Sequence, residues 1–465
     1  MLPNNPASLL DALRAAENLS GRVLVDVNTR IALGDLANGT VLYGRAEELR
    51  GRSVLLTTRE QVTTAAALIE LDGLAGRIVI CPPDLPLQYF AYVIETAEID
   101  AIVSDRTDFD LGRPRPLYFS PCTRRIEACA NDRVRDQQTE WVLFTSGTTG
   151  LPKLAVHTLK SLTGAIQPNR QGGEEVIWST FYDIRRYGGL QIFLRAALTG
   201  SSLVLSTTQQ STAEFLEHAA VNQVTHISGT PSHWRRALMS PTAKLLQPRY
   251  VRLSGEIADQ GILNHLRSFY PNARMSHAFA STEAGVAFEV NDDTAGFPAG
   301  ILESTPDVEM KVEDGTLRIR SARTASRYLG MGASALKDED GYVDTRDVVE
   351  LQDGRYYFAG RRDGAINVGG LKVFPEEIES VINRHPEVHM SLVRTRKSSV
   401  TGALVVADVM LKPTATMTDR DINAIQNDIL SLCRSNLSSY KVPAMISFVP
   451  DFNVAESGKV MRRNA

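Results

Sequence analysis

Short apolar runs alternate with helix-like stretches along much of the first 360 residues of the chain. Residues 51–58 and 76–83 are apolar runs typical of strands, and residues 59–75 between them favour a helix. Residues 98–105 form another apolar run, which ends on a turn. Strands that alternate with helices are typical of an α/β fold with mostly parallel sheets. The pattern therefore predicts a large N-terminal domain of parallel sheets and helices.

The pattern changes from about Gly296. Residues 308–321 read as a hairpin that turns at Asp314-Gly315, a dipeptide typical of tight hairpin turns. This segment predicts a small antiparallel subdomain after the parallel sheets.

A second change falls at residues 360–364, where charged and glycine residues separate two structured regions as a hinge does. The remaining residues read as helix, strand, strand and helix, which indicates a small α+β domain. We therefore predict two domains, residues 1–361 and a mobile C-terminal domain of residues 362–465.

Charge and cysteine content narrow the class of protein. The 465 residues carry 50 basic and 54 acidic side chains, so bulk charge gives no reason to expect nucleic acid or an anionic membrane as a partner. The four cysteines form no CxxC pair and none has zinc-ligand spacing to a histidine, which favours reduced thiols in a cytoplasmic protein. No run approaches the roughly 20 apolar residues of a membrane helix. The N-terminus reads as an amphipathic helix and not as a signal peptide.

The loop after the apolar strand at residues 141–144 is rich in glycine and hydroxyl side chains. Glycines let backbone N–H groups converge on an anion, and Lys153 adds a compact positive charge. A polyphosphate fits such a loop, although the Walker A pattern occurs nowhere in the chain. The alternative, a flexible linker, does not normally follow an apolar strand and carry Pro152-Lys153.

Residues 144–158 (FTSGTTGLPKLAVHT) resemble the phosphate-binding signature of the acyl-adenylate-forming superfamily. That superfamily contains acyl- and aryl-CoA synthetases, peptide-synthetase adenylation domains and luciferase. Further segments resemble its other elements in the family's order: HAFASTEAG (277–285), GYVDTRDVVEL (341–351), GRRDGAINVGGLKVFPEEIES (360–380) and SGKVMRR (457–463).

The resemblance implies a reaction in two steps. A carboxylate attacks the α-phosphate of ATP, which releases pyrophosphate and leaves an acyl-AMP, and a thiol then attacks the acyl carbonyl. It implies ATP, Mg²⁺ and coenzyme A, and therefore an acid–thiol ligase. The alternative is a freestanding adenylation enzyme that loads a carboxylic or amino acid onto the phosphopantetheine of a separate carrier protein. A homodimer is left open.

Three residues would carry the first step if the resemblance holds. Thr282 would bond to the α-phosphate, Glu283 would hold Mg²⁺ and Lys459 would bridge carboxylate and phosphate oxygens. From the residues alone, Thr282 and Glu283 also suit a helix cap with its first-turn acid, and Lys459 suits a solvated basic tail.

The resemblance assigns further residues to the nucleotide. Asp347 would accept hydrogen bonds from the ribose, and Arg361 would contact the same sugar or a phosphate, unless it forms an exposed pair with Asp363, the expected hinge residue. The remaining nucleotide residues would be Thr145, Ser146, Gly147, Thr148, Thr149, Gly150, Lys153, Glu256, His277, Ala278 and Phe279.

The sequence says least about which carboxylic acid is the substrate. Asp183 could hold a substrate amine or pair with Arg185 or Arg186, and we favour the pairing; an arginine in the pocket would suit a second anionic or polar group. The predicted acyl-pocket residues are Asp183, Arg186, Tyr187, Gly189, Ser254, Gly255 and Ala280, and the predicted thiol-facing residues are Gly369 and Gly370. The chain departs from the family pattern at Arg346, Ala280, Asn367 and Asn453.

Overall fold

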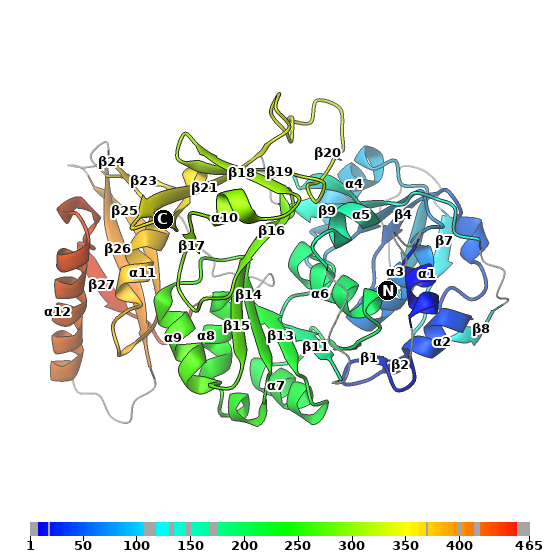
Figure 1. Cartoon of the computed structure of the whole chain (residues 1–465), viewed down its shortest axis with the longest axis horizontal. Helices are drawn as coiled ribbons and strands as arrows, with labels where there is room; N and C mark the ends of the chain where they lie inside the picture. Colours follow the sequence, from blue (N-terminus) through cyan, green and yellow to red (C-terminus); the bar gives the residue numbers. More distant parts are fainter. Residues whose placement is uncertain are drawn as a thin grey trace.

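A computed structural model describes residues 8–16, 19–106, 118–129, 134–145, 150–166, 175–368, 371–398, 402–412 and 419–452. The seven-stranded sheet, the eight-stranded sheet and the C-terminal unit follow one another along the long axis, and the antiparallel sheet lies above the eight-stranded sheet in the view of Figure 1. The predicted α/β class, with a small antiparallel subdomain and a smaller C-terminal unit, is confirmed. None of the helices in the described part is long and apolar enough to cross a membrane.

The eight-stranded sheet is parallel except at its two edges. Its strands, in spatial order, are β16 (Gly285–Val290), β15 (Arg274–Ser281), β14 (Tyr250–Ser254), β13 (His226–Gly229), β11 (Ile177–Thr180), β12 (Ser202–Val204), β1 (Val23–Val25) and β2 (Arg30–Ala32). One face packs on α6 (Tyr187–Leu198), and the other packs on α7 (Thr212–Val221), α8 (Pro231–Met239) and α9 (Gln260–Phe269). Because both faces are covered, these strands are apolar or fully buried along most of their length.

The seven-stranded sheet carries the predicted phosphate loop. Its strands, in spatial order, are β20 (Arg327–Tyr328), β10 (Lys153–Thr158), β9 (Glu140–Thr145), β5 (Arg77–Ile80), β4 (Ser53–Leu56), β6 (Ala101–Ser104) and β7 (Tyr118–Pro121). The remaining elements near it are α1 (Leu9–Ala15), α2 (Leu33–Asn38), β3 (Gly39–Thr40), α3 (Gln61–Leu71), α4 (Phe90–Thr96), β8 (Glu127–Ala128) and α5 (Leu159–Thr163). Helix α3 is buried on every side, because it lies in the core shared by the two large sheets.

The antiparallel subdomain is a five-stranded sheet. Its strands, in spatial order, are β17 (Phe297–Pro298), β22 (Arg355–Arg361), β21 (Val343–Gln352), β19 (Thr316–Ser321) and β18 (Val308–Glu313), and α10 (Ile301–Ser304) lies beside it. Glu313 pairs with Thr316, so Asp314 and Gly315 form the two-residue turn with positive φ angles of 51° and 74°. The predicted hairpin and its turn are confirmed.

The C-terminal unit has a core of its own. Its elements are β23 (Ile366–Val368), β24 (Leu371–Val373), α11 (Pro375–Ile382), β25 (Val388–Ser398), β26 (Gly402–Leu411), α12 (Asp419–Asn436) and β27 (Met445–Phe448). The sequence analysis missed β27, which adds to β26 in parallel. The domain boundary predicted at residues 361 and 362 stays a prediction.

Polar contacts join the C-terminal unit to α8 and α9. The buried Arg235 donates to the carbonyl of His389 at 3.0 Å and pairs with Asp259 at 2.5 Å. Asn383 Nδ2 donates to the same Asp259 carboxylate at 3.2 Å. A Cβ at Gly261 would lie 2.7 Å from the carbonyl oxygen of Asn383, so only glycine permits this close approach.

The four cysteines are free thiols. Cys81, Cys122 and Cys433 are buried, whereas Cys129 is half-buried. Burial raises the pKa of Cys81 to about 12 and that of Cys433 to about 11.

Candidate active site

Two chain segments that are far apart in sequence meet at the end of β9. Thr145 Oγ1, on the last residue of β9, donates to Glu283 Oε1 at 2.7 Å. The Tyr328 hydroxyl donates to the same oxygen at 3.0 Å. The two hydrogen bonds fix one oxygen of a half-buried carboxylate beside the predicted phosphate loop. Ser146, Gly147, Thr148 and Thr149 of that loop lie outside the described residues.

Thr282 and Glu283 occupy the turn between β15 and β16 and not a helix. The helix-cap alternative is therefore wrong for this pair. The turn is closed by Ala284 N–H, which donates to Ser281 Oγ at 3.0 Å. Gly285 follows with a φ of 75°, and a Cβ there would lie 2.4 Å from a backbone oxygen of Arg323.

A buried histidine on β10 is hydrogen-bonded to the same turn. His157 Nε2 lies 2.7 Å from the carbonyl oxygen of Thr282 and donates to it. Burial lowers the pKa of His157 to about 4, so the ring is neutral at pH 7. The sequence analysis missed this residue, because a lone histidine on an apolar strand carries no specific signal.

Lys153 is the first residue of β10 and pairs with Thr145 across the hairpin. Its ammonium lies 4.9 Å from the centre of the Tyr328 ring and donates to Ser334 Oγ at 3.3 Å. It faces a cavity of about 240 Å³ that is also lined by Tyr92, Thr96 and residues 328–334. Gly150 lies at the described start of the same hairpin arm, with a φ of 83°. The structure therefore gathers a hydroxyl, a carboxylate and an ammonium around one tyrosine.

Asp347 and Arg361 lie opposite each other on β21 and β22. Arg361 Nε is 3.9 Å from Asp347 Oδ1, and Arg361 Nη2 donates to the carbonyl of Thr345 at 3.3 Å. Asp363 pairs with Arg346 at 2.7 Å, so the alternative pair of Arg361 with Asp363 is not the one that forms.

Side chains alternate along β15, so Ala278 and Phe279 point to opposite faces of the sheet. Ala278 pairs with Ser254 of β14. Phe279 instead stacks with Phe288 and Phe358 in the core of the antiparallel subdomain. His277 Nε2 donates to the carbonyl of Thr294 at 3.0 Å, and burial lowers its pKa. The nucleotide roles predicted for His277, Ala278 and Phe279 stay predictions.

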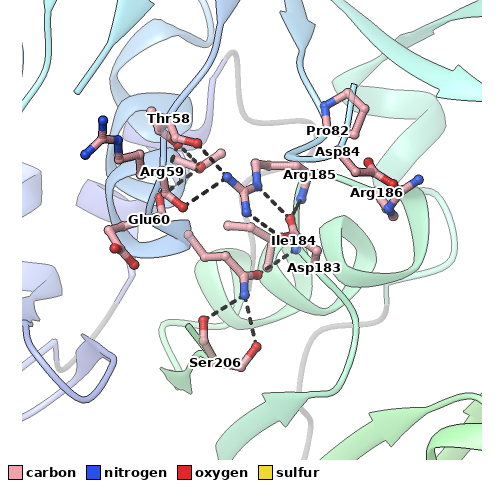
Figure 2. A network of polar contacts seen from close by, with 12 residues as sticks. Thr58, Arg59, Glu60, Pro82, Asp84, Asp183, Ile184, Arg185, Arg186 and Ser206 are labelled. Carbon is pink, nitrogen blue, oxygen red and sulfur yellow. Dashed lines mark hydrogen bonds and ion pairs between the residues drawn. The ribbon is translucent and has the colours of Figure 1, made fainter. Parts of the chain in front are cut away.

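Asp183 forms the favoured ion pair, and its partner is Arg185 (Figure 2). Arg185 Nε and Nη2 donate to the two carboxylate oxygens at 2.8 and 2.5 Å, and Nη1 donates to the carbonyl of Thr58 at 2.6 Å. Arg186 pairs instead with Asp84. Gly189 is required nearby, because a Cβ there would lie 2.2 Å from the carbonyl oxygen of Asp183.

The C-terminal end of β14 and the N-terminal end of α8 lie near residues 181–186, the loop that precedes α6. The buried Tyr182 hydroxyl donates to the Ser254 carbonyl at 2.6 Å. Gly255 has a φ of 82°, and Glu256 Oε2 accepts from the Ser232 N–H at 2.9 Å at the start of α8. Tyr187 is buried at the start of α6. Tyr328 was missed by the sequence analysis, because only its position in the fold gives it a role. Whether Ala280 lines an acyl pocket stays a prediction.

Lys459, Gly369 and Gly370 lie outside the described residues. Within the described ranges there is no group of three side chains able to hold a metal ion. Glu283 would supply a carboxylate oxygen to Mg²⁺, an ion that keeps several waters and binds substrate phosphates.

The fold is that of an α/β protein, and the hydroxyl, carboxylate and ammonium groups gathered at its strand ends suit a phosphate-bearing ligand. The chain belongs to the AMP-binding enzyme family. The family model "AMP-binding enzyme" matches residues 51–325, and the model "AMP-binding enzyme C-terminal domain" matches residues 377–459.

Named relatives and solved structures agree with this family. The chain is 29% identical to the 2-succinylbenzoate–CoA ligase of Salmonella typhimurium over 373 residues, which is 77% of this chain and 75% of the relative. It is 26% identical over 98% of its length to a probable non-canonical nonribosomal peptide synthetase, CymA of Salinispora arenicola, and spans 6% of that protein. The structure of the anthranilate CoA ligase AuaEII with anthranoyl-AMP superposes with a TM-score of 0.79 at 17% identity, over 97% of this chain and 95% of that one. This last likeness concerns the fold.

Proposed function

We propose that the protein is an ATP-dependent acid–thiol ligase, which activates a carboxylic acid as an acyl-AMP and transfers the acyl group to coenzyme A. The observation that carries the proposal is the convergence of Thr145, Glu283 and Tyr328 beside Lys153. The names of relatives such as 2-succinylbenzoate–CoA ligase support the same reaction class.

In the first step two anions must approach each other, so the site has to offset their charge and align them. Lys153 and the hydroxyls of residues 145–149 would bind the β- and γ-phosphates, and Thr282 would bond to the α-phosphate. Mg²⁺ held by Glu283 would neutralise phosphate charge. Asp347 would orient the ribose.

Lys459 would complete the first step from the C-terminal domain, and Gly369-Gly370 would border the thiol in the second. Both roles require residues 362–465 to turn about Asp363 between the two steps. The pair of Asp363 with Arg346 is exposed, so breaking it would cost at most about 1 kcal/mol. The geometry at the predicted hinge therefore suits such a turn.

The second candidate is a freestanding enzyme that loads a carrier protein, which the match to a nonribosomal peptide synthetase favours. Asp183 weighs against an amino-acid substrate, because Arg185 already occupies both of its carboxylate oxygens.

The experiment that tests the function is ATP–pyrophosphate exchange across aryl, fatty, dicarboxylic and amino acids. Each acid that exchanges is repeated with coenzyme A, and the thioester is detected by mass. A thioester supports the ligase, exchange without a thioester supports carrier loading, and the absence of exchange with every acid contradicts both. The cytoplasmic location and the homodimer stay predictions.

Glu283→Gln is the sharpest variant for the same assay. We expect it to lower exchange about 100-fold or more, because a neutral amide holds Mg²⁺ poorly. Glu303→Gln is the matched control, since Glu303 is an exposed acid on α10. Equal activity of the two variants would contradict the role of Glu283.

A further inference from the structure

The eight-stranded sheet has a row of buried polar residues on the face that α6 covers. Side chains alternate along a strand, so Arg252 and Ser254 of β14 point to the same face. Ser228 of β13 and Ser276 of β15 pair with Arg252 on either side. A parallel sheet covered by helices normally presents apolar side chains here. Ser254 and Ser276 are hydrogen-bonded to the hydroxyls of Tyr182 and Tyr250, so only Arg252 and Ser228 of this row remain to be accounted for.

Two buried polar groups on this face lack a hydrogen bond. Arg252 is 4% exposed and Ser228 is fully buried, and neither Arg252 Nε nor Ser228 Oγ has a hydrogen-bond partner among the described residues. Helix α6 covers this face, and the Nε of its Arg195 also has no hydrogen-bond partner among the described residues. Buried polar groups are nearly always hydrogen-bonded, because an unmade bond costs the full desolvation of the group.

The charges of this cluster do not balance. Among the described residues, Glu289 is the carboxylate that pairs with Arg252, with its Oε2 3.7 Å from Arg252 Nε, and its Oε1 already accepts from the Tyr250 hydroxyl. Burial alone would lower the pKa of Arg252, but Glu289 and the phenols of Tyr250, Tyr182 and Tyr187 raise it, so the guanidinium is charged.

The other titratable groups on this face do not remove the excess of positive charge. Arg195 lies with its guanidinium 5.7 Å from the Trp178 ring, and burial followed by the charge of Arg252 lowers its pKa without neutralising it at pH 7. Burial lowers the pKa of His226 to about 4, which makes it neutral. Two buried cations therefore face one carboxylate, and one further anion would balance them.

The position of the cluster matches the far end of a substrate. Ser254 ends β14 next to the predicted site of acyl transfer, and Arg252 lies two residues deeper, which is roughly 7 Å along the strand. The phenols of Tyr187, a predicted acyl-pocket residue, and of Tyr182, the neighbour of Asp183, are close enough to raise the pKa of Arg252.

We propose that Arg252, assisted by Ser228 and Arg195, binds a second carboxylate of the acid substrate, so that the enzyme selects dicarboxylic acids. The inference rests on the proposed function and specifies its substrate class. Arg185 and Arg186, the arginines singled out by the sequence, are already paired with Asp183 and Asp84 and are not needed for this role.

The test compares dicarboxylic acids with their own half-esters. Straight-chain diacids of four to eight carbons and terephthalate are each assayed beside the monomethyl ester in ATP–pyrophosphate exchange. The ester keeps the carboxylate that is activated and removes the charge at the far end. We expect at least one diacid to exceed its half-ester by about 30-fold or more in kcat/KM.

Three variants assign that preference to Arg252. Arg252→Met is expected to bring the ratio of diacid to half-ester close to one. Arg252→Lys keeps a charge but not the two-pronged donor, so an intermediate ratio is expected, and this variant serves if the methionine variant does not fold. Arg30→Met is the matched control, because Arg30 is an exposed arginine on the edge strand β2 of the same sheet, and its ratio should equal that of the wild type.

Each remaining outcome overturns a definite statement. If half-esters are used as well as diacids, or if only simple monocarboxylic acids exchange, the inference is wrong and the ligase function stands. A wild-type preference that survives in Arg252→Met also overturns it. If no acid exchanges at all, the proposed function fails and the inference fails with it.

Discussion

Arg346 stands in a left-handed backbone conformation, with a φ of 61°. Related proteins are expected to have glycine at this position of the Thr-Gly-Asp element, and glycine adopts such a φ without strain. The arginine side chain recovers part of the cost through its pair with Asp363. The departure noted in the sequence is thus a strained residue with a partner at the predicted hinge.

We expect Arg346→Gly to leave stability unchanged or to raise it by up to about 1 kcal/mol, because relief of strain offsets the loss of an exposed ion pair. Arg346→Ala is the matched variant, since it loses the same pair but keeps the strain, and it should be about 1 kcal/mol less stable than Arg346→Gly. Urea denaturation of the three proteins measures the difference. A glycine variant less stable than the alanine variant would contradict the strain.

At the scale of single residues, the sequence predicted some contacts of the candidate site and missed others. The contact of Thr145 with Glu283 joins two motifs that each had a recognisable pattern. The sequence predicted that Asp183 pairs with Arg185 or Arg186, and the structure shows that the partner is Arg185. The contacts of Arg252 and Tyr328 were not predicted, because an arginine or tyrosine within a strand gains a role only from the strands and helices that pack against it.

At the scale of elements, the loop of residues 181–186 before α6 is hydrogen-bonded to the N-terminal half of the chain. Arg185 donates to the carbonyl of Thr58, and Gln61 of α3 accepts from Ile184 N–H at 2.8 Å and donates to Ser206 (Figure 2). The loop thus joins segments on both large sheets. These bonds hold Asp183 and Arg186, two of the predicted acyl-pocket residues, in a loop of defined shape.

Arg185→Met should destabilise the protein by about 3 kcal/mol, because it leaves the half-buried Asp183 carboxylate without its cation. Asp183→Asn in the same background should recover part of the loss. Arg186→Met is the control, since its pair with Asp84 is more exposed and is expected to matter by less than about 1 kcal/mol. Urea denaturation followed by tryptophan fluorescence suits this test, and equal losses in the two methionine variants would refute it.

The contact between α9 and α11 yields a second prediction for elements. Gly261→Ala would press a methyl group against the Asn383 carbonyl, so we expect the C-terminal unit to separate more readily from α9. Limited proteolysis within residues 362–374 should then become several-fold faster. Gly34→Ala is the control, because a Cβ at Gly34 would have open space around it. An unchanged cleavage rate for Gly261→Ala would contradict this role of the contact.

Element types were more predictable than element partners. The hairpin of β18 and β19 was predicted to the residue, since its turn dipeptide and its alternation are local signals. The order of strands in the two large sheets and the addition of β27 to β26 were not predicted. Those pairings join residues distant in sequence, and local periodicity carries no information about them.

For the molecule as a whole, histidine burial sets the response to acid. All eight histidines have pKa values lowered mainly by burial, and His157, His226, His233 and His389 have values of about 4. Unfolded histidine titrates near 6.5. Between these values the unfolded chain binds more protons than the folded chain, so stability falls as pH falls. Asp72, whose pKa burial raises to about 6, acts in the opposite direction and offsets about one histidine.

We therefore expect the free energy of unfolding to drop by roughly 3 kcal/mol or more between pH 7 and pH 5.5. Urea denaturation at several pH values measures the slope. Replacement of His157 by glutamine should flatten the slope by about one proton. A stability independent of pH in this window would show that the histidines are not held neutral.

The burial of three of the four thiols has a practical consequence for watching the enzyme move. A thiol-reactive dye would modify Cys129 far faster than Cys81, Cys122 or Cys433, since those three are shielded from solvent. The natural chain thus offers one attachment point, on the large N-terminal part. One added cysteine on the exposed side of α12 would supply the second, so that energy transfer between two dyes could follow the C-terminal unit through a single turnover without removing any native residue.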